Sequence, residues 1–288
     1  MKINLSEITI QKITKPDLII LIGWASEEGW NPGKHDGDVF WHTDPDGFYG
    51  VKMGDKLIAG GAIISYGGDF GFMGIFIVHN QYRSKGIGNK LWHERKNVLI
   101  GRLKENAAIG MDGVLAMQPF YHNGGFNIAF RDERYEFYGK GYTYSDNVST
   151  IVSEDFDDIL KYDCLHFGFQ RTQFLNQWLI MPESKAIKYK EGNEIVGYAV
   201  IRKAEKGYKI GPLFAQNDTI AGELLKCCLS HGSEDSVFLD IPTINENAMN
   251  LVRNYDGKYI FECARMYHGQ APNIPINHIY GITSFELG

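Results

Sequence analysis

The feature that most constrains the fold of this chain is an internal repeat. Two β-prone segments of the first half, 56–64 and 74–78, resemble 194–201 and 211–215 in the second half. The spacing is constant, because Gly197 follows Gly60 by 137 positions and Gly211 follows Gly74 by the same 137. One spacing shared by two separate segments indicates a duplicated α/β unit.

The repeat divides the 288 residues into two units of ordinary domain size. We expect an N-terminal domain over residues 1–145 and a C-terminal domain over 150–288, joined by a Ser-, Asp- and Asn-rich linker near 145–153. Strand and helix patterns are mixed within each unit, so each is expected to have an α/β (α+β) fold.

Turn residues and apolar spacing predict the elements of the first domain. Pro16 and Asp17 indicate the start of a helix that ends near Glu28, and Gly54-Asp55 indicates a hairpin. The segment 30–36 has the composition of a turn. Strands are expected within 3–13 and over 48–51, 57–65, 72–78, 114–117 and 126–138, a helix over 88–102, and a short helix or turn over 120–124.

Charge and cysteine content exclude several classes of partner. The net charge is −6 and no run of Lys or Arg occurs, which argues against nucleic acid or an anionic membrane as partner. The four cysteines show no CxxC spacing, so neither a disulfide framework nor a metal site is expected. The apolar runs near the N-terminus are too short to span a bilayer. We therefore expect a soluble, cytoplasmic protein; the sequence specifies no oligomeric state.

The strongest chemical signal is the loop after the fourth expected strand, which reads Arg83-Ser84-Lys85-Gly86-Ile87-Gly88. Glycines let the backbone approach a ligand closely, and consecutive amides at a helix N-terminus can bind a pyrophosphate. Six residues alone are equally consistent with a solvated turn. The loop lacks the Lys-Ser/Thr of a P-loop, and a position after the fourth strand disfavours a Rossmann fingerprint.

In this context, residues 76–88 resemble the GCN5-related N-acetyltransferase (GNAT) family, in which a hydrophobic strand precedes Arg/Gln-x-x-Gly-x-Gly; Asn80 replaces a frequent proline. Residues 121–126 (YHNGGF) resemble the late Tyr-x-x-x-Gly-Phe of that family. The segments 27–33, 112–114, 265–269 and 280–288 resemble a subgroup with a second, GNAT-like C-terminal domain. The resemblance implies tandem domains, each a mixed, mostly antiparallel twisted sheet flanked by helices.

The same resemblance implies acetyl-CoA as co-substrate. The backbone of Phe76, Ile77 and Val78 would pair with the pantetheine arm, and the amide of Val78 would lie near the developing oxyanion. The pyrophosphate would be bound by the amides of Arg83, Ser84, Lys85, Gly86, Ile87 and Gly88.

The resemblance also implies acetyl transfer to an amine. Tyr121 is the expected general acid, since a phenol pKa of about 10 is close to that of the leaving thiol. The fourth strand carries no carboxylate, so the general base is open among Glu27, Glu28, Asp36 and Asp112, a water chain, or an acceptor that is already neutral. We adopt Glu28 as the candidate base, and we expect Glu27, Trp30 and Asp112 on the acceptor side.

The second copy lacks the glycine loop, because Gln216-Asn217-Asp218 follows its strand and Asp218 would repel a pyrophosphate. Chemistry is therefore expected in the N-terminal domain. No cysteine lies near the motifs, which favours direct transfer in a ternary complex. The acceptor would be an amine of a small molecule or of a protein or peptide. A non-catalytic acetyl-CoA sensor and a purely structural tandem protein are the other hypotheses.

Overall fold

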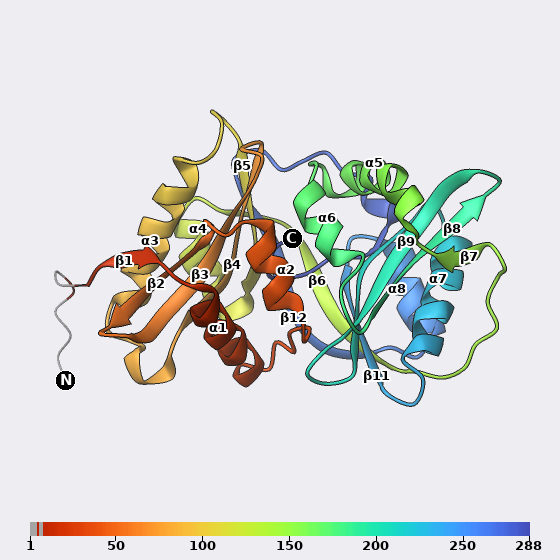
Figure 1. Ribbon diagram of the computed structural model, residues 1–288, viewed down its shortest axis with the longest axis horizontal. Helices are drawn as coiled ribbons and strands as arrows, with labels where there is room; N and C mark the ends of the chain where they lie inside the picture. The colour runs from red at the N-terminus through yellow and green to blue at the C-terminus, as the bar shows by residue number, and fades with distance from the viewer. Residues whose placement is uncertain (1–4, 6–7) are drawn as a thin grey trace.

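A computed structural model describes residue 5 and residues 8–288 of the chain, as two halves that lie side by side (Figure 1). The first expected strand falls partly outside the described residues; its described part is β1. The N-terminal half contains β1 (Ile10–Lys12), α1 (Lys15–Glu27), α2 (Asp36–Thr43), β2 (Phe48–Met53), β3 (Lys56–Tyr66), β4 (Phe70–Val78), α3 (Ile87–Ile100), β5 (Ala108–Val114) and α4 (Gln118–Asn123).

The second half repeats much of this order. It contains β7 (Val148–Thr150), α5 (Phe156–Phe167), α6 (Thr172–Trp178), β8 (Ser184–Glu191), β9 (Glu194–Lys203), β10 (Tyr208–Ala215), α7 (Asp218–His231), β11 (Ser236–Pro242), α8 (Glu246–Asn254) and β13 (Ile279–Gly281). In both halves, three antiparallel strands are followed by a helix and then by a parallel strand: β4 pairs parallel with β5, and β10 pairs parallel with β11. Each half is thus a mixed, mostly antiparallel sheet flanked by helices.

The two halves exchange strands at their border. β6 (Asn127–Tyr138) pairs with β11 of the second half, and β12 (Lys258–His268) pairs with β5 of the first. Because β6 and β12 also pair with each other, the strands form one sheet in the order β1-β2-β3-β4-β5-β12-β6-β11-β10-β9-β8-β7. The chain therefore crosses into the second half before residue 145, and the linker predicted near 145–153 contains β7, which pairs with β8.

The helix start predicted at Pro16 is present, because Thr14 and Asp17 form a capping box at the N-terminus of α1. One local prediction is wrong. Residues 114–117 are the end of β5 and a 3₁₀ helix, and the strand covers Ala108–Val114 instead; its two glycines and its aspartate have low β propensity. The turn predicted over 30–36 is present up to His35, but the helix α2, which begins at the buried Asp36, was not predicted.

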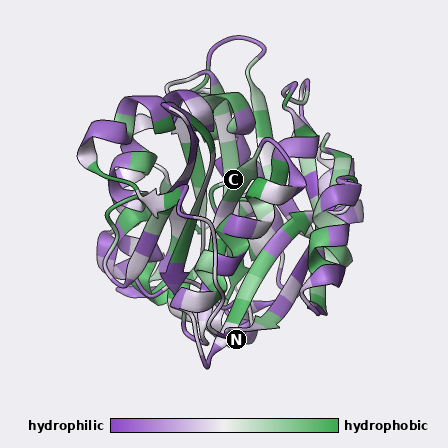
Figure 2. Cartoon of the chain, turned by 90° about the vertical axis from the view of Figure 1, so that its right-hand side faces the viewer, coloured by the Kyte–Doolittle hydropathy of each residue, from purple (hydrophilic) through white to green (hydrophobic). Residues whose placement is uncertain are grey.

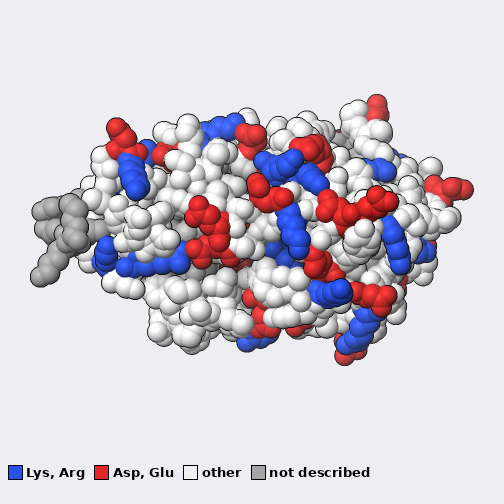
Figure 3. Space-filling view, turned by 90° about the horizontal axis from the view of Figure 1, so that it is seen from below, with Lys and Arg blue, Asp and Glu red and all other residues white. Residues whose placement is uncertain are grey.

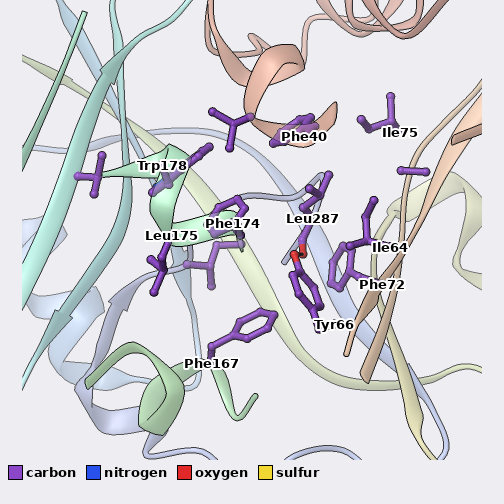
Figure 4. Packing of buried hydrophobic residues seen from close by; sticks show 14 of the residues in the cluster. Phe40, Ile64, Tyr66, Phe72, Ile75, Phe167, Phe174, Leu175, Trp178 and Leu287 are labelled. Atoms are coloured by element: carbon purple, nitrogen blue, oxygen red, sulfur yellow. Dashed lines mark hydrogen bonds between the residues drawn. The ribbon is translucent and has the colours of Figure 1, made fainter. Parts of the chain in front are cut away.

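Both halves share a hydrophobic core. Figure 2 shows apolar residues concentrated along the strands, with polar residues on the outer sides of the helices. Figure 4 shows where the halves meet: Phe40, Tyr66 and Phe72 of the first half face Phe174 and Trp178 of α6. All five side chains are buried, so this contact belongs to the interior and holds the halves in one arrangement.

On the face seen in Figure 3, acidic and basic side chains are interspersed, and neither sign forms one continuous patch. That nucleic acid and membranes are not partners stays a prediction. In the described part of the chain, no helix combines the length and the apolar character that crossing a bilayer requires.

Candidate active site

The candidate site begins where two parallel strands of the N-terminal half separate. β4 and β5 pair only from Phe70 to Phe72. Beyond Phe72, the side of β4 that faces β5 has no strand partner among the described residues. Apart from the carbonyls of Gly74 and Val78, which accept from Arg95 and Arg83, the backbone groups on that side are available to an extended ligand, as a sheet edge is available to an added strand.

A β-bulge marks the start of this free segment. The register between β3 and β4 shifts between Gly60 and Ala62, and Ile75 has a φ of 48°. Positive φ is strained for a β-branched residue, and burial of the Ile75 side chain in the shared core holds it there. The bulge interrupts the regular pairing just before Phe76, Ile77 and Val78, the residues predicted to bind the pantetheine arm.

The predicted pyrophosphate loop follows directly after β4. Ser84 has a φ of 58° and Gly86 a φ of 81°, an alternation that gathers successive amides into an anion-binding nest. No carbonyl of the described residues accepts a hydrogen bond from the amides of Ser84 to Asn89. Gly86 is also the N-cap of α3 and makes no side-chain cap, so the positive end of the helix faces the loop.

Between the open strand edge and this loop lies a cavity of about 600 Å³. Of the predicted cofactor residues, Phe76, Ile77, Val78, Arg83, Ser84, Gly86 and Gly88 line it. Two others do not: the Lys85 ammonium donates to the carbonyl of Gln81 at 2.7 Å, and the Ile87 side chain packs in the core beneath α3. For Lys85 and Ile87, the backbone amide, and not the side chain, remains a candidate for pyrophosphate binding.

Tyr121, the predicted general acid, lies on α4 and lines the same cavity. Its ring packs against Trp92 and over Gly113, where a Cβ atom would be 3.0 Å from the Tyr121 ring. Burial raises the pKa of Tyr121 to about 12. The phenol therefore stays protonated at neutral pH and can act as a proton donor.

The predicted base, Glu28, lines the cavity but forms an ion pair with the guanidinium of Arg83. Arg83 also donates from Nε to the carbonyl of Val78 at 2.8 Å. Glu28 is therefore engaged beside the pyrophosphate loop. Glu27 is exposed and does not line the cavity, and Asp36 is buried in an ion pair with Arg202.

Asp112 lines the cavity from β5, and both of its oxygens are engaged by Arg265 of β12, at 2.7 and 2.9 Å. Burial raises the pKa of the Asp112 carboxyl to about 6, and the Arg265 charge opposes that rise. The neighbouring Asp132 carboxyl is fully buried, and burial together with the Asp112 charge raises its pKa well above the usual range.

Trp30 also lines the cavity, and the second half holds its loop. The guanidinium of Arg134 donates to the carbonyl of Trp30 at 2.7 Å. Two hydrogen bonds, of 3.0 and 2.8 Å, join the Asn31 side chain to the backbone of Lys206. Contacts between the halves thus fix this wall of the cavity.

Sequence reasoning missed a further wall, which comes from the second half: Phe261, Cys263, Phe285 and Glu286. β12 brings the first two beside β5, and the C-terminal segment (residues 279–288) brings the other two. The only sequence signal for the latter is the resemblance of 280–288 to the tandem subgroup. The expectation that no cysteine lies near the site is wrong, because strand exchange places Cys263 in the cavity wall.

The second copy has the same separation of strands, but the chain itself fills it. β10 and β11 pair from Tyr208 to Ile210, and β13 then pairs with β10 at Leu213 and Phe214. At the repeat spacing of 137, these two residues correspond to Phe76 and Ile77. The side chain of Asn217 caps α7, and the Tyr280 hydroxyl donates to Asp218. The C-terminal segment therefore occupies the place that is open in the first copy.

Comparisons with known proteins agree with this geometry. Residues 16–126 match the Acetyltransferase (GNAT) family, and residues 159–281 match an Acetyltransferase (GNAT) domain. The chain belongs to the GNAT acetyltransferase family. It carries two such domains in tandem, as the repeat predicts, and it is a member of a family of acyltransferases that generally use acyl-CoA.

Several relatives have a similar length. Holothin acyltransferase of Pseudoalteromonas sp. is 26% identical over 92% of this chain and 89% of its own. The uncharacterized N-acetyltransferase YitH of Bacillus subtilis is 24% identical over 75% of this chain and 76% of its own.

Solved structures share the fold. A putative acetyltransferase from Pyrococcus horikoshii has a TM-score of 0.84 at 18% identity, covering 99% of this chain and 98% of its own. A tandem GNAT protein from the clavulanic acid biosynthesis pathway has a TM-score of 0.60 at 12% identity, covering 93% of this chain and 100% of its own. These likenesses confirm the tandem GNAT fold.

Proposed function

We propose that this GNAT protein transfers an acetyl group from acetyl-CoA to an amine, by direct attack in a ternary complex within the cavity of the N-terminal half. The observation that carries the proposal is that an unpaired strand edge and a loop of free amides lie at one cavity. A ligand with an extended amide-bearing arm and a pyrophosphate needs both features together.

The chemistry follows from the residues that line the cavity. The pantetheine amides pair with Phe76 to Val78, and the amide of Val78 stabilises the oxyanion as the amine nitrogen attacks the thioester carbon. The C–S bond then breaks, and Tyr121 protonates the departing thiolate. A neutral phenol suits this role because the acid must hold its proton until the thiolate forms.

Direct transfer is favoured over an acyl-cysteine intermediate even though Cys263 lines the cavity. Burial and the nearby carboxylates of Asp112, Asp240 and Asp132 raise the pKa of the Cys263 thiol. The thiolate is the reactive nucleophile, and it is strongly disfavoured in this setting. The name of the holothin relative supports acyl transfer as the reaction, and the apolar wall of Trp30, Phe261 and Phe285 favours an amine on an apolar body.

The test is thiol release from acetyl-CoA with a panel of small-molecule amines and peptides. We expect turnover with some acceptor, and in Tyr121→Phe a fall in kcat of about 100-fold or more, the usual contribution of a positioned acid. The acetyl-CoA Kd should stay within about threefold, since only a hydroxyl is removed. Tyr138→Phe, on the exposed part of β6, is the matched control and should behave as wild type.

Acetyl-CoA binding without turnover across the panel would indicate a sensor instead of an enzyme. Absence of binding would contradict the assignment of the cavity to acetyl-CoA.

A further inference from the structure

The C-terminal segment places a carboxylate beside the β4 bulge, where the fourth strand itself has none. Glu286 lines the cavity and is 2% exposed. Its backbone is in close contact with Gly74, because a Cβ atom built at Gly74 would lie 1.8 Å from the carbonyl oxygen of Glu286. Gly74 directly precedes the bulge at Ile75. Glu286 therefore lies near the segment that is proposed to hold the thioester.

The residues on both sides of Glu286 are firmly anchored. The Leu287 side chain packs in the shared core, and the Tyr66 hydroxyl donates to the Leu287 carbonyl at 2.8 Å (Figure 4). Arg171 donates to the carbonyl of Gly288 at 3.2 Å and to the hydroxyl of Thr283 at 2.7 Å. A carboxylate held in this way is pre-positioned for a ligand, since little side-chain freedom is left to lose on binding.

The surroundings of Glu286 leave one of its oxygens available. Oε1 lies 3.8 Å from the ammonium of Lys209 on β10, and Arg134 on β6 adds a second positive charge that acts on Glu286. Asp112 on β5 is close enough for its carboxyl to interact electrostatically with that of Glu286. Oε2 is buried and has no hydrogen-bond partner among the described residues. A buried carboxylate oxygen without a donor is costly, so a donor from a ligand is expected there.

The other carboxylates of the cavity are already engaged. Glu28 pairs with Arg83 at the pyrophosphate loop, and both oxygens of Asp112 accept from Arg265. Among these three cavity carboxylates, Glu286 is the one with a buried acceptor atom that no described residue satisfies. Lys209 supports this role, because its ammonium lies 3.8 Å from Oε1 and leaves Oε2 free for a ligand.

We propose that Glu286 is the general base of the first copy and binds the acceptor amine through Oε2. This inference rests on the proposed acetyl transfer. The neutral amine donates an N–H to Oε2, and its lone pair attacks the thioester carbon, so that the N–C bond forms. The nitrogen becomes acidic in that step and passes one proton to Glu286, while the C–S bond breaks and the thiolate takes a proton from Tyr121. The second domain thus supplies a catalytic residue to the first.

The test compares Glu286→Gln and Glu286→Ala with wild type in the thiol-release assay, with calorimetric titration of acetyl-CoA. We expect kcat to fall by about 100-fold or more in both variants. The acetyl-CoA Kd should stay within about threefold, which also shows that the variants are folded. Sodium formate should restore turnover at least about tenfold in Glu286→Ala, because a small carboxylate can occupy the vacated space.

Two controls separate a catalytic role from a structural one. Formate should not restore Tyr121→Phe, in which the acid is missing instead of the base. Glu194→Gln, an exposed carboxylate of β9, should retain wild-type turnover. If wild type turns over and Glu286→Gln has the same kcat, or if formate fails to restore Glu286→Ala, the assignment of Glu286 is overturned and acetyl transfer stands. If wild type has no turnover with any amine, both proposals fall.

Discussion

At the scale of single residues, buried ion pairs hold the C-terminal segment in place. Asp163 and Arg171 are fully buried and form two hydrogen bonds, of 2.8 and 2.6 Å. The same guanidinium binds Thr283 and Gly288. Removing the carboxylate charge would leave a cation without compensation in the interior, and this is costly in proteins. The pair therefore connects the stability of the fold to the position of Glu286.

We predict that Asp163→Asn lowers the free energy of unfolding by about 3 kcal/mol. The control is Asp158→Asn on the same helix. Asp158 is exposed, with its Oδ1 3.4 Å from Nζ of Lys161, and this change should lower the free energy of unfolding by less than about 1 kcal/mol. Urea denaturation followed by fluorescence measures both values. Equal effects of the two changes would contradict the role given to the buried pair.

The residues of the site differ in how far sequence alone reveals them. The loop Arg83–Gly88 acts through its own consecutive amides, so a local pattern is enough to predict it. Glu286 lies about two hundred positions further along the chain. Its place in the cavity depends on the path of the C-terminal segment, and no local pattern encodes that path.

At the scale of elements, the two strand separations have different occupants. β13 fills the separation of β10 and β11, and the one between β4 and β5 stays open along Phe76 to Val78. The C-terminal segment (residues 279–288) contacts Gly74 in the first copy and Gly211 in the second. These glycines are 137 positions apart, and each contacts a backbone carbonyl of the segment, that of Glu286 or of Thr283. Both copies thus need a glycine where the segment passes.

We predict that Gly211→Ala destabilises the protein by about 2 kcal/mol, the usual cost of overpacking. A Cβ atom there would lie 2.2 Å from the carbonyl oxygen of Thr283, and a backbone atom cannot move aside as a side-chain end can. Gly141→Ala, with nothing within 4 Å, should change stability by less than about 0.5 kcal/mol. Chemical denaturation measures the free energy of unfolding of both variants. An unchanged value in Gly211→Ala would contradict a close contact between Gly211 and the carbonyl of Thr283.

The repeat predicted which elements correspond, because the constant spacing of 137 aligns β3 with β9 and β4 with β10. It could not predict that β6 and β12 cross between the halves. Strand order is set by contacts between residues far apart in sequence, which a local repeat does not encode. The helix α2 was not predicted because it lacks a recognisable start signal: its N-cap residue, His35, makes no side-chain capping hydrogen bond.

For the whole molecule, strand exchange makes the two halves interdependent. Both partners of β6 lie in the second half, and β5 has β12 on one side. A fragment of residues 1–145 would expose the edge of β5 and leave β6 without a strand partner. The shared core and the wall of the cavity that contains Glu286 would be lost with the second half.

We therefore predict that residues 1–145 expressed alone neither unfold cooperatively nor bind acetyl-CoA, whereas the full chain unfolds in a single transition. Circular dichroism on thermal unfolding and calorimetric titration provide the two readouts. A fragment that binds acetyl-CoA with the affinity of the full chain would contradict this interdependence.

The central claim is that one of two similar domains keeps an open acyl-CoA site. The most direct measurement is calorimetric titration of the full chain with acetyl-CoA, beside Gly86→Glu and the control Gly54→Glu. Gly54 also has positive φ, but it lies in the exposed β2–β3 turn with nothing within 4 Å. We predict one acetyl-CoA per chain, binding abolished in Gly86→Glu by an anionic side chain in the nest, and binding retained in Gly54→Glu. Two sites per chain, or wild-type affinity in Gly86→Glu, would contradict the account.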